Sequence, residues 1–469
     1  MFTAVLHAEP LDIGARLEPL VDRYLIDQLD NTEHRLHEFY PSGTALRFDA
    51  PWEGRYCGYV TVFRDGDLCR MYYRGLPDPN KDGSDTEVTC YAESADGIVW
   101  TKPNLGLFEV HGTRENNVIL ADMAPYSHNF SPFLDSRPGV DPAEKYKAVA
   151  GTVDKGLAAF VSPDGLRWTM AKEKIITQGA FDSQNVAFWS EAEQAYLCYL
   201  RSWTEGDFGG FRWVSRAVSK DFLNWEAPVV MDKGGAPWEH IYTNQTQPYY
   251  RAPHIYIAVA ARFMPERQVV SAEEAAALGI QGGYGKDCSD NVLMTSRGGS
   301  HYDRTFMEGF IRPGIGAENW TSRTNYPAYG IVPTGEKEMS LYVQHNYGQP
   351  TAYLARYAIR PDGFASVRAS YAGGGMTTKP LRFAGDTLSV NFATSAAGGV
   401  RVGMLDENGA PLPGLAPEDC VELVGNFIDR PVRWNSGKTL AGLAGATVRL
   451  RFVMKDADLY ALRFGNGGE

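Results

Sequence analysis

The chain has 469 residues, enough for one large and one smaller domain, and its contents of 44% hydrophobic and 22% charged residues are those of an ordinary globular protein. Its formal net charge of −12 argues against nucleic acid or an anionic membrane surface as a partner, because both would repel an acidic protein. The six cysteines form no Cys-x-x-Cys pair, so we expect buried free thiols and neither disulfides nor a zinc site.

The N-terminal residues do not read as a secretory signal. Glu9, Pro10 and Asp12 interrupt the apolar run, and no basic stretch precedes it. No apolar stretch elsewhere approaches the length of a membrane span. We therefore expect a cytoplasmic protein without a membrane partner, and leave open whether it forms a homo-oligomer.

A short turn motif recurs along the chain. The pattern Ser-x-Asp-Gly-x-x-Trp occupies residues 94–100 and 162–168, returns with Phe in place of Gly at 219–225, and has weaker echoes at 296–302 and 360–364. Asp-Gly supplies a turn in which Gly can adopt a positive φ, and the Ser and Asp side chains can bond the nearby backbone. The Trp then anchors the outgoing segment in a hydrophobic layer.

Each copy of the motif follows an alternating, strand-like stretch, such as residues 68–73 or 195–200. Several strands per copy, at a spacing of roughly 60 residues, fit the blades of a β-propeller. We therefore predict an all-β fold with a five-bladed β-propeller, four or six blades being the alternatives. One helix is predicted at 271–278, where Ser271 and Glu274 have the spacing of a capping box.

The pattern changes after the glycines at 373–375. Strict alternation at 388–392, 400–402 and 448–452 predicts the half-exposed antiparallel strands of a C-terminal β-sandwich. We expect three parts: an N-terminal segment packed on the propeller (1–48), the five-bladed propeller that carries the site (49–369), and the β-sandwich domain (370–469).

Polar residues lead into the first strand of each predicted blade. The inner strands of a propeller converge on one channel, so these residues should face a shared funnel. The five segments are 49–54, 128–135, 181–189, 238–248 and 323–327. Further groups stand where strands end, namely Arg74, Arg201, Arg262 and His345.

Cleavage of a glycosidic bond needs two carboxyl groups, one that donates a proton and one that is ionised. Asp182 precedes a predicted buried strand, and Glu239 lies between Trp238 and His240, where partial desolvation could raise a carboxyl pKa. Glu53 is the third catalytic candidate. Each also has a structural interpretation: a turn or cap residue for Asp182, a solvated loop residue for Glu239, and an ion-pair partner for Glu53.

Side chains that can bind sugar hydroxyls or stack on a sugar ring lie in the same segments. The predicted substrate-binding residues are His128, Asn129, Gln184, Asn185, Arg201, Asn244, Gln247, Arg262, Tyr326 and His345. Asp85 and Glu87 border a loop that could reach the funnel. The histidines lack a metal-binding spacing and the Gly-rich stretches lack a strand–Gly–helix context, so neither a metal nor a nucleotide cofactor is predicted.

The recurring Ser-x-Asp-Gly-x-x-Trp units and the polar blade starts resemble those of the five-bladed propeller glycosidases, which include invertases, levansucrases, arabinanases and β-xylosidases. The likeness covers most of the chain in architecture but only the turn motif in sequence, and it extends to bacterial propeller proteins of uncharacterised activity. It implies a C-terminal sandwich, Asp182 as a transition-state stabiliser and Glu239 as the general acid. The Asn-Asp-Pro-Asn-Gly-like stretch of invertases is missing, so the first-blade carboxylate stays open among Asp27, Asp30, Asp49 and Glu53.

These observations predict a glycoside hydrolase that removes terminal sugar units, furanosides included, from small oligosaccharides by carboxylate acid–base catalysis. Its partner would be a small carbohydrate. A glycoside phosphorylase is one alternative, and would need a cationic phosphate pocket for which Arg201, Arg262 and His345 are candidates. A non-catalytic sugar-binding propeller is the other, because blades fold without catalytic residues.

Overall fold

The computed structural model describes residues 9–78, 82–206, 208–281 and 283–466. The fold is all-β, with 50% strand and 4% helix. The chain divides into two compact units, which we call the central unit (Phe39–Ile359) and the terminal unit (Met1–Glu38 with Arg360–Glu469). In the described ranges, no helix has the length and apolar character needed to cross a membrane.

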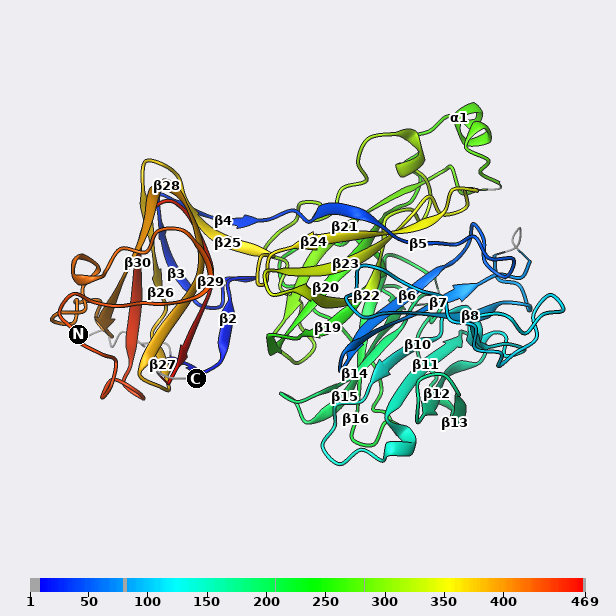
Figure 1. The fold of residues 1–469 in the computed structure, drawn as a ribbon, viewed down its shortest axis with the longest axis horizontal. Coiled ribbons are helices and arrows are strands. Elements are labelled where there is room, and N and C mark those ends of the chain that lie inside the picture. The colour runs from blue at the N-terminus through cyan, green and yellow to red at the C-terminus, as the bar shows by residue number, and fades with distance from the viewer. Residues whose placement is uncertain (1–8, 79–81, 207, 282, 467–469) are drawn as a thin grey trace. The chain divides into compact units, whose positions relative to one another are not determined.

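The central unit consists of antiparallel sets of four strands (Figure 1). Three sets are separate sheets: β10 (Ser131–Leu134), β11 (Tyr146–Thr152), β12 (Gly156–Ser162) and β13 (Thr169–Ile176); β14 (Val186–Ser190), β15 (Ala195–Trp203), β16 (Arg212–Ser219) and β17 (Val229–Val230); β18 (His240–Thr243), β19 (Thr246–Tyr249), β20 (Ala252–Met264) and β21 (Cys288–Ser296). The sheet of eight strands contains two more: β5 (Tyr40–Arg47), β24 (Tyr353–Ile359), β23 (Glu338–His345) and β22 (Tyr326–Gly335); β6 (Gly58–Asp65), β7 (Leu68–Gly75), β8 (Val88–Ser94) and β9 (Val118–Leu120).

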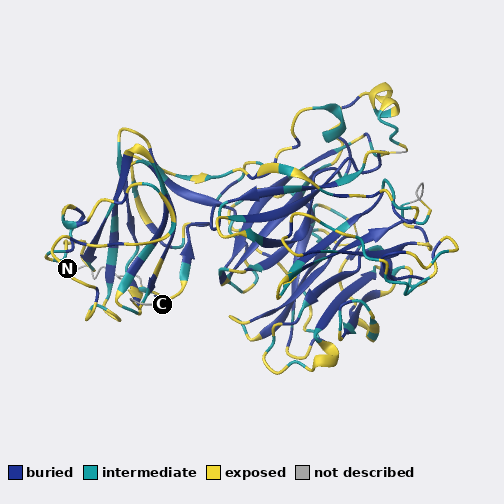
Figure 2. Ribbon diagram, in the orientation of Figure 1, coloured by how far each residue is buried: buried dark blue, intermediate teal, exposed yellow. Residues whose placement is uncertain are grey.

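One strand of each set contacts a strand of the next set. β6 contacts β10, β10 contacts β14, β14 contacts β19, and β19 contacts β22. The series returns to its start where Tyr329 of β22 pairs in parallel with Thr61 of β6. Most residues of these strands are buried (Figure 2), as expected for apolar strands with neighbours on both faces.

The predicted turn motif is confirmed. In the copy at 94–100, the Ser94 hydroxyl accepts the Gly97 N–H at 2.8 Å and Oδ1 of Asp96 accepts the Val99 N–H at 2.9 Å. The Trp100 indole donates to the Gly97 carbonyl at 3.2 Å. Copies 162–168 and 219–225 repeat these bonds. Phe222 adopts φ 71°, close to the 72° of Gly97, so the side-chain bonds hold the turn even where a Cβ disfavours it.

The predicted helix is also confirmed. Helix α1 (Ala272–Ala277) begins after Ser271, whose hydroxyl accepts the Glu274 N–H at 3.1 Å while the Glu274 carboxylate accepts the Ser271 N–H at 2.7 Å. Short 3₁₀ helices complete the described helical structure: η1 (Tyr126–His128), η2 (Pro142–Glu144), η3 (Ala317–Asn319) and η4 (Pro417–Asp419).

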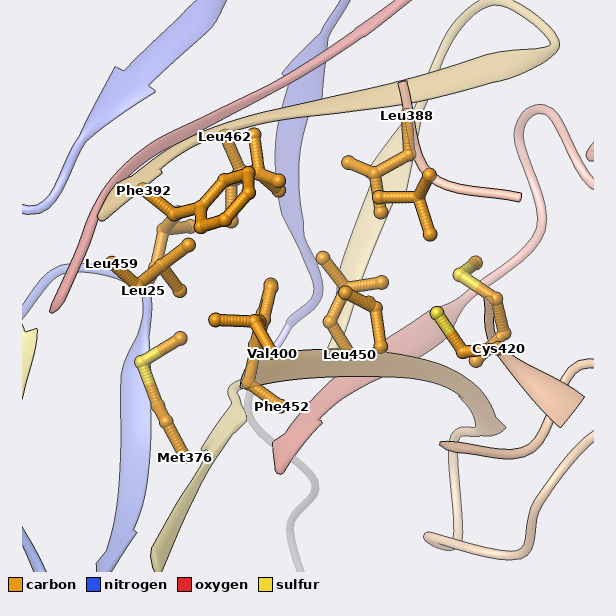
Figure 3. Packing of buried hydrophobic residues seen from close by; sticks show 14 of the residues in the cluster. Leu25, Met376, Leu388, Phe392, Val400, Cys420, Leu450, Phe452, Leu459 and Leu462 are labelled. Carbon is orange, nitrogen blue, oxygen red and sulfur yellow. The ribbon is translucent and has the colours of Figure 1, made fainter. Parts of the chain in front are cut away.

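The terminal unit is built on a sheet of ten strands. They are β1 (Leu11–Gly14), β2 (Leu17–Pro19), β3 (Ile26–Asp30), β4 (Thr32–Leu36), β25 (Ala365–Ala369), β26 (Gly374–Thr378), β27 (Leu381–Phe383), β28 (Thr387–Asp406), β29 (Asn426–Pro431) and β30 (Val448–Gly465). The long strand β30 pairs with β2, β25, β26, β27 and β28 along its length. Its sheet encloses one apolar core, in which Leu388, Phe392 and Phe452 are fully buried (Figure 3).

The predicted domain boundaries need correction at both ends. β1 pairs with β27, β3 with β26 and β4 with β25, so residues 11–36 belong to the sheet of the C-terminal strands and not to a segment packed on the propeller. The boundary after the central unit falls at residue 360 instead of 370. The echo at 360–364 follows β24 as the other copies follow their strands, but lies in the terminal unit. Pairing between residues about 340 apart leaves no local signal in the sequence.

All six cysteines are free and buried, as predicted. Burial raises the pKa of the Cys57 thiol far above its usual value, so this side chain acts as a small hydrophobic group.

Candidate active site

Charged side chains meet in the central unit at the ends of strands from different sets. We call this group the arginine–carboxylate cluster. It consists of four arginines and four carboxyl groups, namely Arg74, Arg201, Arg212, Arg323, Asp82, Glu87, Asp182 and Asp287. The ion pairs and electrostatic interactions described below connect them.

Asp82 lies in the loop after β7 and is held by two arginines. Arg323 Nη1 lies 2.7 Å from its Oδ2, and Arg74 Nη2 lies 3.2 Å from its Oδ1. The Tyr284 hydroxyl donates to Oδ2 at 2.7 Å. Burial alone would raise the pKa of Asp82, but the two guanidinium ions and the Tyr284 bond outweigh it and hold this pKa well below the usual range. Asp82 is therefore ionised at any physiological pH.

Glu87 forms a second buried contact with Arg74, together with His128. His128 Nδ1 lies 2.8 Å from Glu87 Oε2, and Arg74 Nη1 lies 3.1 Å from His128 Nδ1 and 3.9 Å from Glu87 Oε1. Burial alone would raise the pKa of Glu87, but the bond to His128 and the charge of Arg74 together outweigh this effect. The pKa of Glu87 is therefore lowered. Ligand atoms of Asp82, Glu87 and His128 lie within 4.8 Å of one another, a spacing that could suit a metal ion. The Arg74 guanidinium contacts all three and already supplies positive charge there.

Asp182 carries the most exposed carboxylate of the ion pairs in this cluster. Its Oδ1 accepts from Arg201 Nη1 at 2.7 Å, and 46% of its side chain is exposed, whereas Arg201 is buried. Arg201 also donates to the Tyr242 carbonyl at 2.8 Å and lies 4.0 Å from the centre of the Tyr242 ring. A fixed, buried cation therefore presents an accessible carboxylate, which suits a group that must approach a substrate.

Asp287 precedes β21 and differs from the other carboxyl groups. Burial raises its pKa, although a bond to Ser322 and the charges of Arg323 and Arg212 oppose this direction. Its buried Oδ1 has no hydrogen-bond partner within the described ranges. Asp287 therefore keeps its proton to higher pH than an ordinary Asp, which is the property that a general acid requires.

The arginines connect these groups into one site. Arg323 pairs with Asp82 and also acts electrostatically on Asp287. Arg212 acts on Asp287 and is itself influenced by Asp182. The cluster thus contains Asp287, whose pKa is raised, beside Asp82 and Glu87, whose pKa values are lowered.

Tyrosines surround the cluster. The Tyr59 ring lies 5.0 Å from the Arg74 guanidinium, and the Tyr59 hydroxyl is 3.5 Å from the Asp182 carbonyl oxygen, so this residue spans two parts of the site. Tyr326 packs on Tyr242 with ring centres 5.0 Å apart. Four of the predicted site residues therefore belong to the cluster or its aromatic surroundings: Asp182, His128, Arg201 and Tyr326.

Glu239 pairs with two arginines, neither of which belongs to the cluster. Its Oε1 accepts from Arg262 Nη1 at 2.8 Å, and Arg304 Nη2 lies 2.6 Å from its Oε2. Arg262 also pairs with Asp290 through two nitrogens. Glu239, Arg262, Asp290 and Trp320 are among the residues that line a pocket of about 660 Å³. Within the described ranges Glu239 shares no ion-pair partner with Asp182, and an arginine lies beside each of its oxygens, which does not favour the predicted role of general acid.

Glu53 is a structural residue, because its carboxylate is completely buried. Its Oε1 accepts from the Tyr73 hydroxyl at 2.6 Å, and Lys102 Nζ lies 2.6 Å from its Oε2. Oε2 also accepts the Ala50 N–H at 3.0 Å. No oxygen is left for a substrate, so the ion-pair interpretation of Glu53 replaces the catalytic one.

We expect Glu53→Gln to destabilise the protein and leave turnover nearly unchanged. Removing one member of a buried pair leaves Lys102 without its buried partner, at a cost of about 3 kcal/mol in the free energy of unfolding. Urea unfolding measures the loss, and kcat on any substrate of the wild type measures turnover. A folded variant with a large fall in kcat would return Glu53 to the active site.

The predicted amides are structural rather than substrate-binding. Asn129 donates to the Phe181 and Ser183 carbonyls, and Asn185 donates to the same two while accepting the Arg201 N–H. They therefore shape the turn that carries Asp182, in which Phe181 has φ 53°.

The remaining predicted amides connect strands. Gln184 donates to the Thr61 hydroxyl at 2.9 Å, Asn244 accepts the Thr246 N–H at 3.0 Å, and Gln247 accepts the Ile331 N–H at 2.9 Å. His345 is buried between Tyr353 and Tyr357, and burial lowers its pKa to about 4. A neutral, enclosed imidazole does not provide the cationic phosphate ligand that we predicted.

Sequence reasoning missed Asp82, Asp287 and Arg212. Glu87 was considered because it borders a loop, and Arg74 because it stands at a strand exit. Asp287 precedes β21, the last strand of its set in chain order, so the rule of polar residues before the first strand of each blade did not find it. Asp82 lies in a loop whose position depends on Arg323 and Tyr284, more than 200 residues away.

No family model matches the chain, and no curated protein matches it. Among solved structures, a glycoside hydrolase is 12% identical and covers 71% of this chain and 95% of its own, with a TM-score of 0.48. A glycosyl hydrolase from Bacteroides ovatus is 12% identical and covers 74% and 94%, with a TM-score of 0.39. A structure described under the GH130 family of mannoside phosphorylases, which contains hydrolases of β-1,2-mannosidic linkages, is 14% identical and covers 76% and 96%, with a TM-score of 0.37. At this distance the likenesses carry no inference about activity.

Proposed function

We propose that the central unit is a five-bladed β-propeller and the terminal unit a β-sandwich. Five sets of four strands, and a series of strand contacts that returns from β22 to β6, support the propeller. β5 would complete the last blade beside β24, which joins the start of the unit to its end. Two long strands around one apolar core support the sandwich.

We infer that the arginine–carboxylate cluster is the active site of a glycoside hydrolase acting on terminal sugars of small oligosaccharides. The observation that carries the inference is the contrast between Asp287, whose pKa is raised, and Asp82, whose pKa is lowered, in one cluster. Environments that push the pKa values of neighbouring carboxyl groups apart assign acid and base roles. A propeller that only binds sugar needs no such contrast.

The proposed reaction uses two residues directly. Asp287 donates its proton to the glycosidic oxygen as the bond from that oxygen to the anomeric carbon breaks. Asp182, held by Arg201, either attacks the anomeric carbon or takes a proton from the attacking water. Asp82 stays ionised and stabilises the positive charge that develops on the sugar ring. The tyrosines offer faces for the ring and hydroxyls for its substituents.

One observation favours a glycoside phosphorylase as a second candidate. Arg212 has no carboxylate partner within the described ranges and could take phosphate in place of water as the attacking group. Arg262 and His345, the original phosphate candidates, are excluded by their contacts. Arg201, the third candidate phosphate ligand, acts electrostatically on Arg212 but is already paired with Asp182.

We also propose that the enzyme works in the cytoplasm, on sugars imported as short chains, because its thiols are unpaired.

A panel of aryl glycosides and short oligosaccharides, assayed with and without added phosphate, tests the proposed function. We expect release of a single sugar from at least one substrate, without dependence on phosphate. Glu239→Gln serves as the control carboxylate outside the cluster, and its folding is checked by thermal unfolding. Sugar phosphate as the product would favour the phosphorylase. Full activity of an Asp182→Asn and Asp287→Asn double variant would reject the cluster as the active site.

A further inference from the structure

We propose that Arg212 binds an oxyanion of the substrate, so that the ligand of the arginine–carboxylate cluster is an acidic one. This inference rests on the proposed function and specifies its substrate class. The oxyanion would be the carboxylate of an acidic sugar or an inorganic phosphate, and the experiment below separates these two sources.

The Arg212 guanidinium lies among aromatic rings. Its Cζ is 4.5 Å from the centre of the Trp203 ring, 4.9 Å from Phe263 and 5.8 Å from Tyr242. Stacking on ring faces stabilises the cation and fixes its plane, but leaves the N–H groups on its edge available. The N–H groups of Arg212 are therefore available for hydrogen bonds beside Tyr242, which also contacts Arg201.

Arg212 lacks what the other arginines of the cluster have. Arg74 and Arg323 both pair with Asp82, and Arg201 pairs with Asp182. Among the residues that the structure describes, no carboxylate lies within ion-pair distance of Arg212, and its buried Nε has no hydrogen-bond partner. A half-buried cation without a carboxylate at ion-pair distance is unfavourable, and an anion bound beside it would offset this cost.

Among the charged residues around Arg212, the cation Arg201 acts on it more strongly than the carboxylate of Asp182 does. Burial and the charge of Arg201 lower the pKa of Arg212 itself. Burial, Arg212 and Arg201 also lower the pKa of His240, whose Nδ1 accepts the Arg212 backbone N–H at 3.1 Å. A local excess of positive charge in a chain of net charge −12 indicates a place that an anionic ligand is meant to fill.

The chemistry of the edge favours an oxyanion over a neutral hydroxyl. A guanidinium offers two parallel N–H donors that match the two oxygens of a carboxylate or phosphate. Trp203 and Phe263 provide the apolar surface that a sugar ring can cover. A uronic acid would meet both requirements with one molecule, whereas phosphate would use only the donors.

Binding measurements on the full chain test the proposal without relying on turnover. Calorimetry would compare glucuronate and galacturonate with glucose and galactose, and separately inorganic phosphate. We expect an oxyanion ligand to bind at least tenfold more tightly than the matched neutral sugar, and Arg212→Gln to remove this preference. Arg212→Lys keeps the charge but not the paired donors, so it should weaken carboxylate binding several-fold.

Arg430→Gln is the matched control, because the Arg430 guanidinium also lies 4.9 Å from a ring, that of Phe427, but in the terminal unit. It should bind like the wild type. If Arg212→Gln fails to fold, Arg212→Lys decides the question alone.

The outcomes separate cleanly. Preference for uronates assigns the oxyanion to an acidic sugar, and binding of phosphate alone assigns it to the attacking group of a phosphorylase. Equal affinity for acidic and neutral sugars together with no phosphate binding, or a folded Arg212 variant that binds like the wild type, would overturn the inference. Uronate binding by a chain that cleaves no glycoside would leave the inference standing and reject the proposed hydrolase. Cleavage of neutral glycosides only, at a rate that Arg212→Gln does not change, would support the proposed hydrolase and reject the inference about Arg212.

Discussion

Asp287→Asn is expected to lower kcat on an unactivated oligosaccharide by about 10²–10⁴-fold, the usual contribution of general acid catalysis. The amide cannot donate the proton that the leaving oxygen needs, while its size and its contact with Ser322 are nearly unchanged. Substrates with an acidic aryl leaving group need little protonation and should lose much less. Comparing kcat for an alkyl and a nitrophenyl glycoside of the same sugar measures the difference.

The pH dependence provides a second readout of Asp287. Burial raises its pKa, so the acid form, which is the active one, persists above the pH at which a free Asp ionises. Activity should fall as pH rises through this pKa, and the fall should be absent in Asp287→Asn. A variant that keeps the alkaline fall, or loses equal activity on both leaving groups, would contradict the role of proton donor. Glu239→Gln, measured in parallel, should keep the wild-type profile.

Asp182→Ala is expected to lower kcat by about 10³-fold or more on every substrate, whatever the leaving group, because the group that attacks or activates water is gone. The loss should be partly reversed by added formate, whose carboxylate can occupy the space beside Arg201 and replace the missing one. The anomeric configuration of the product released by the wild type then shows whether Asp182 acts on the sugar or on water. Retained configuration indicates attack on the anomeric carbon, and inversion indicates activation of water.

The same substitution leaves Arg201 buried without its carboxylate, so folding must be measured beside activity. Asp182→Asn keeps a hydrogen-bond acceptor for Arg201 and separates the two effects. If Asp182→Asn is stable, inactive and not rescued by formate while Asp182→Ala is rescued, the carboxylate itself is required. Near wild-type activity in a folded Asp182→Asn would remove Asp182 from the mechanism.

Glu239 illustrates how long-range contacts can change the environment that a sequence signal predicts. Its neighbours Trp238 and His240 are aromatic and suggested a desolvated carboxyl group of raised pKa. Desolvation is only one influence, and Arg262 and Arg304 provide two opposite charges from positions 23 and 65 residues further along the chain. The environment of Glu53 also depends on a distant residue, because Lys102, 49 residues away, donates to its carboxylate.

The sequence by itself determined the features that depend on neighbouring residues. The Ser-x-Asp-Gly-x-x-Trp turns form bonds spanning three residues, as Ser94 with Gly97 shows, and the alternation at 448–452 predicts which of these residues of β30 are buried. Only the tertiary structure decided which charges meet: Arg323 reaches Asp82 across 241 residues, and Tyr59 reaches Asp182 across 123. Likewise β4 pairs with β25 although the whole central unit separates them in the sequence. Local bonds are encoded in adjacent side chains, whereas a long-range pair depends on the packing of every strand between its members.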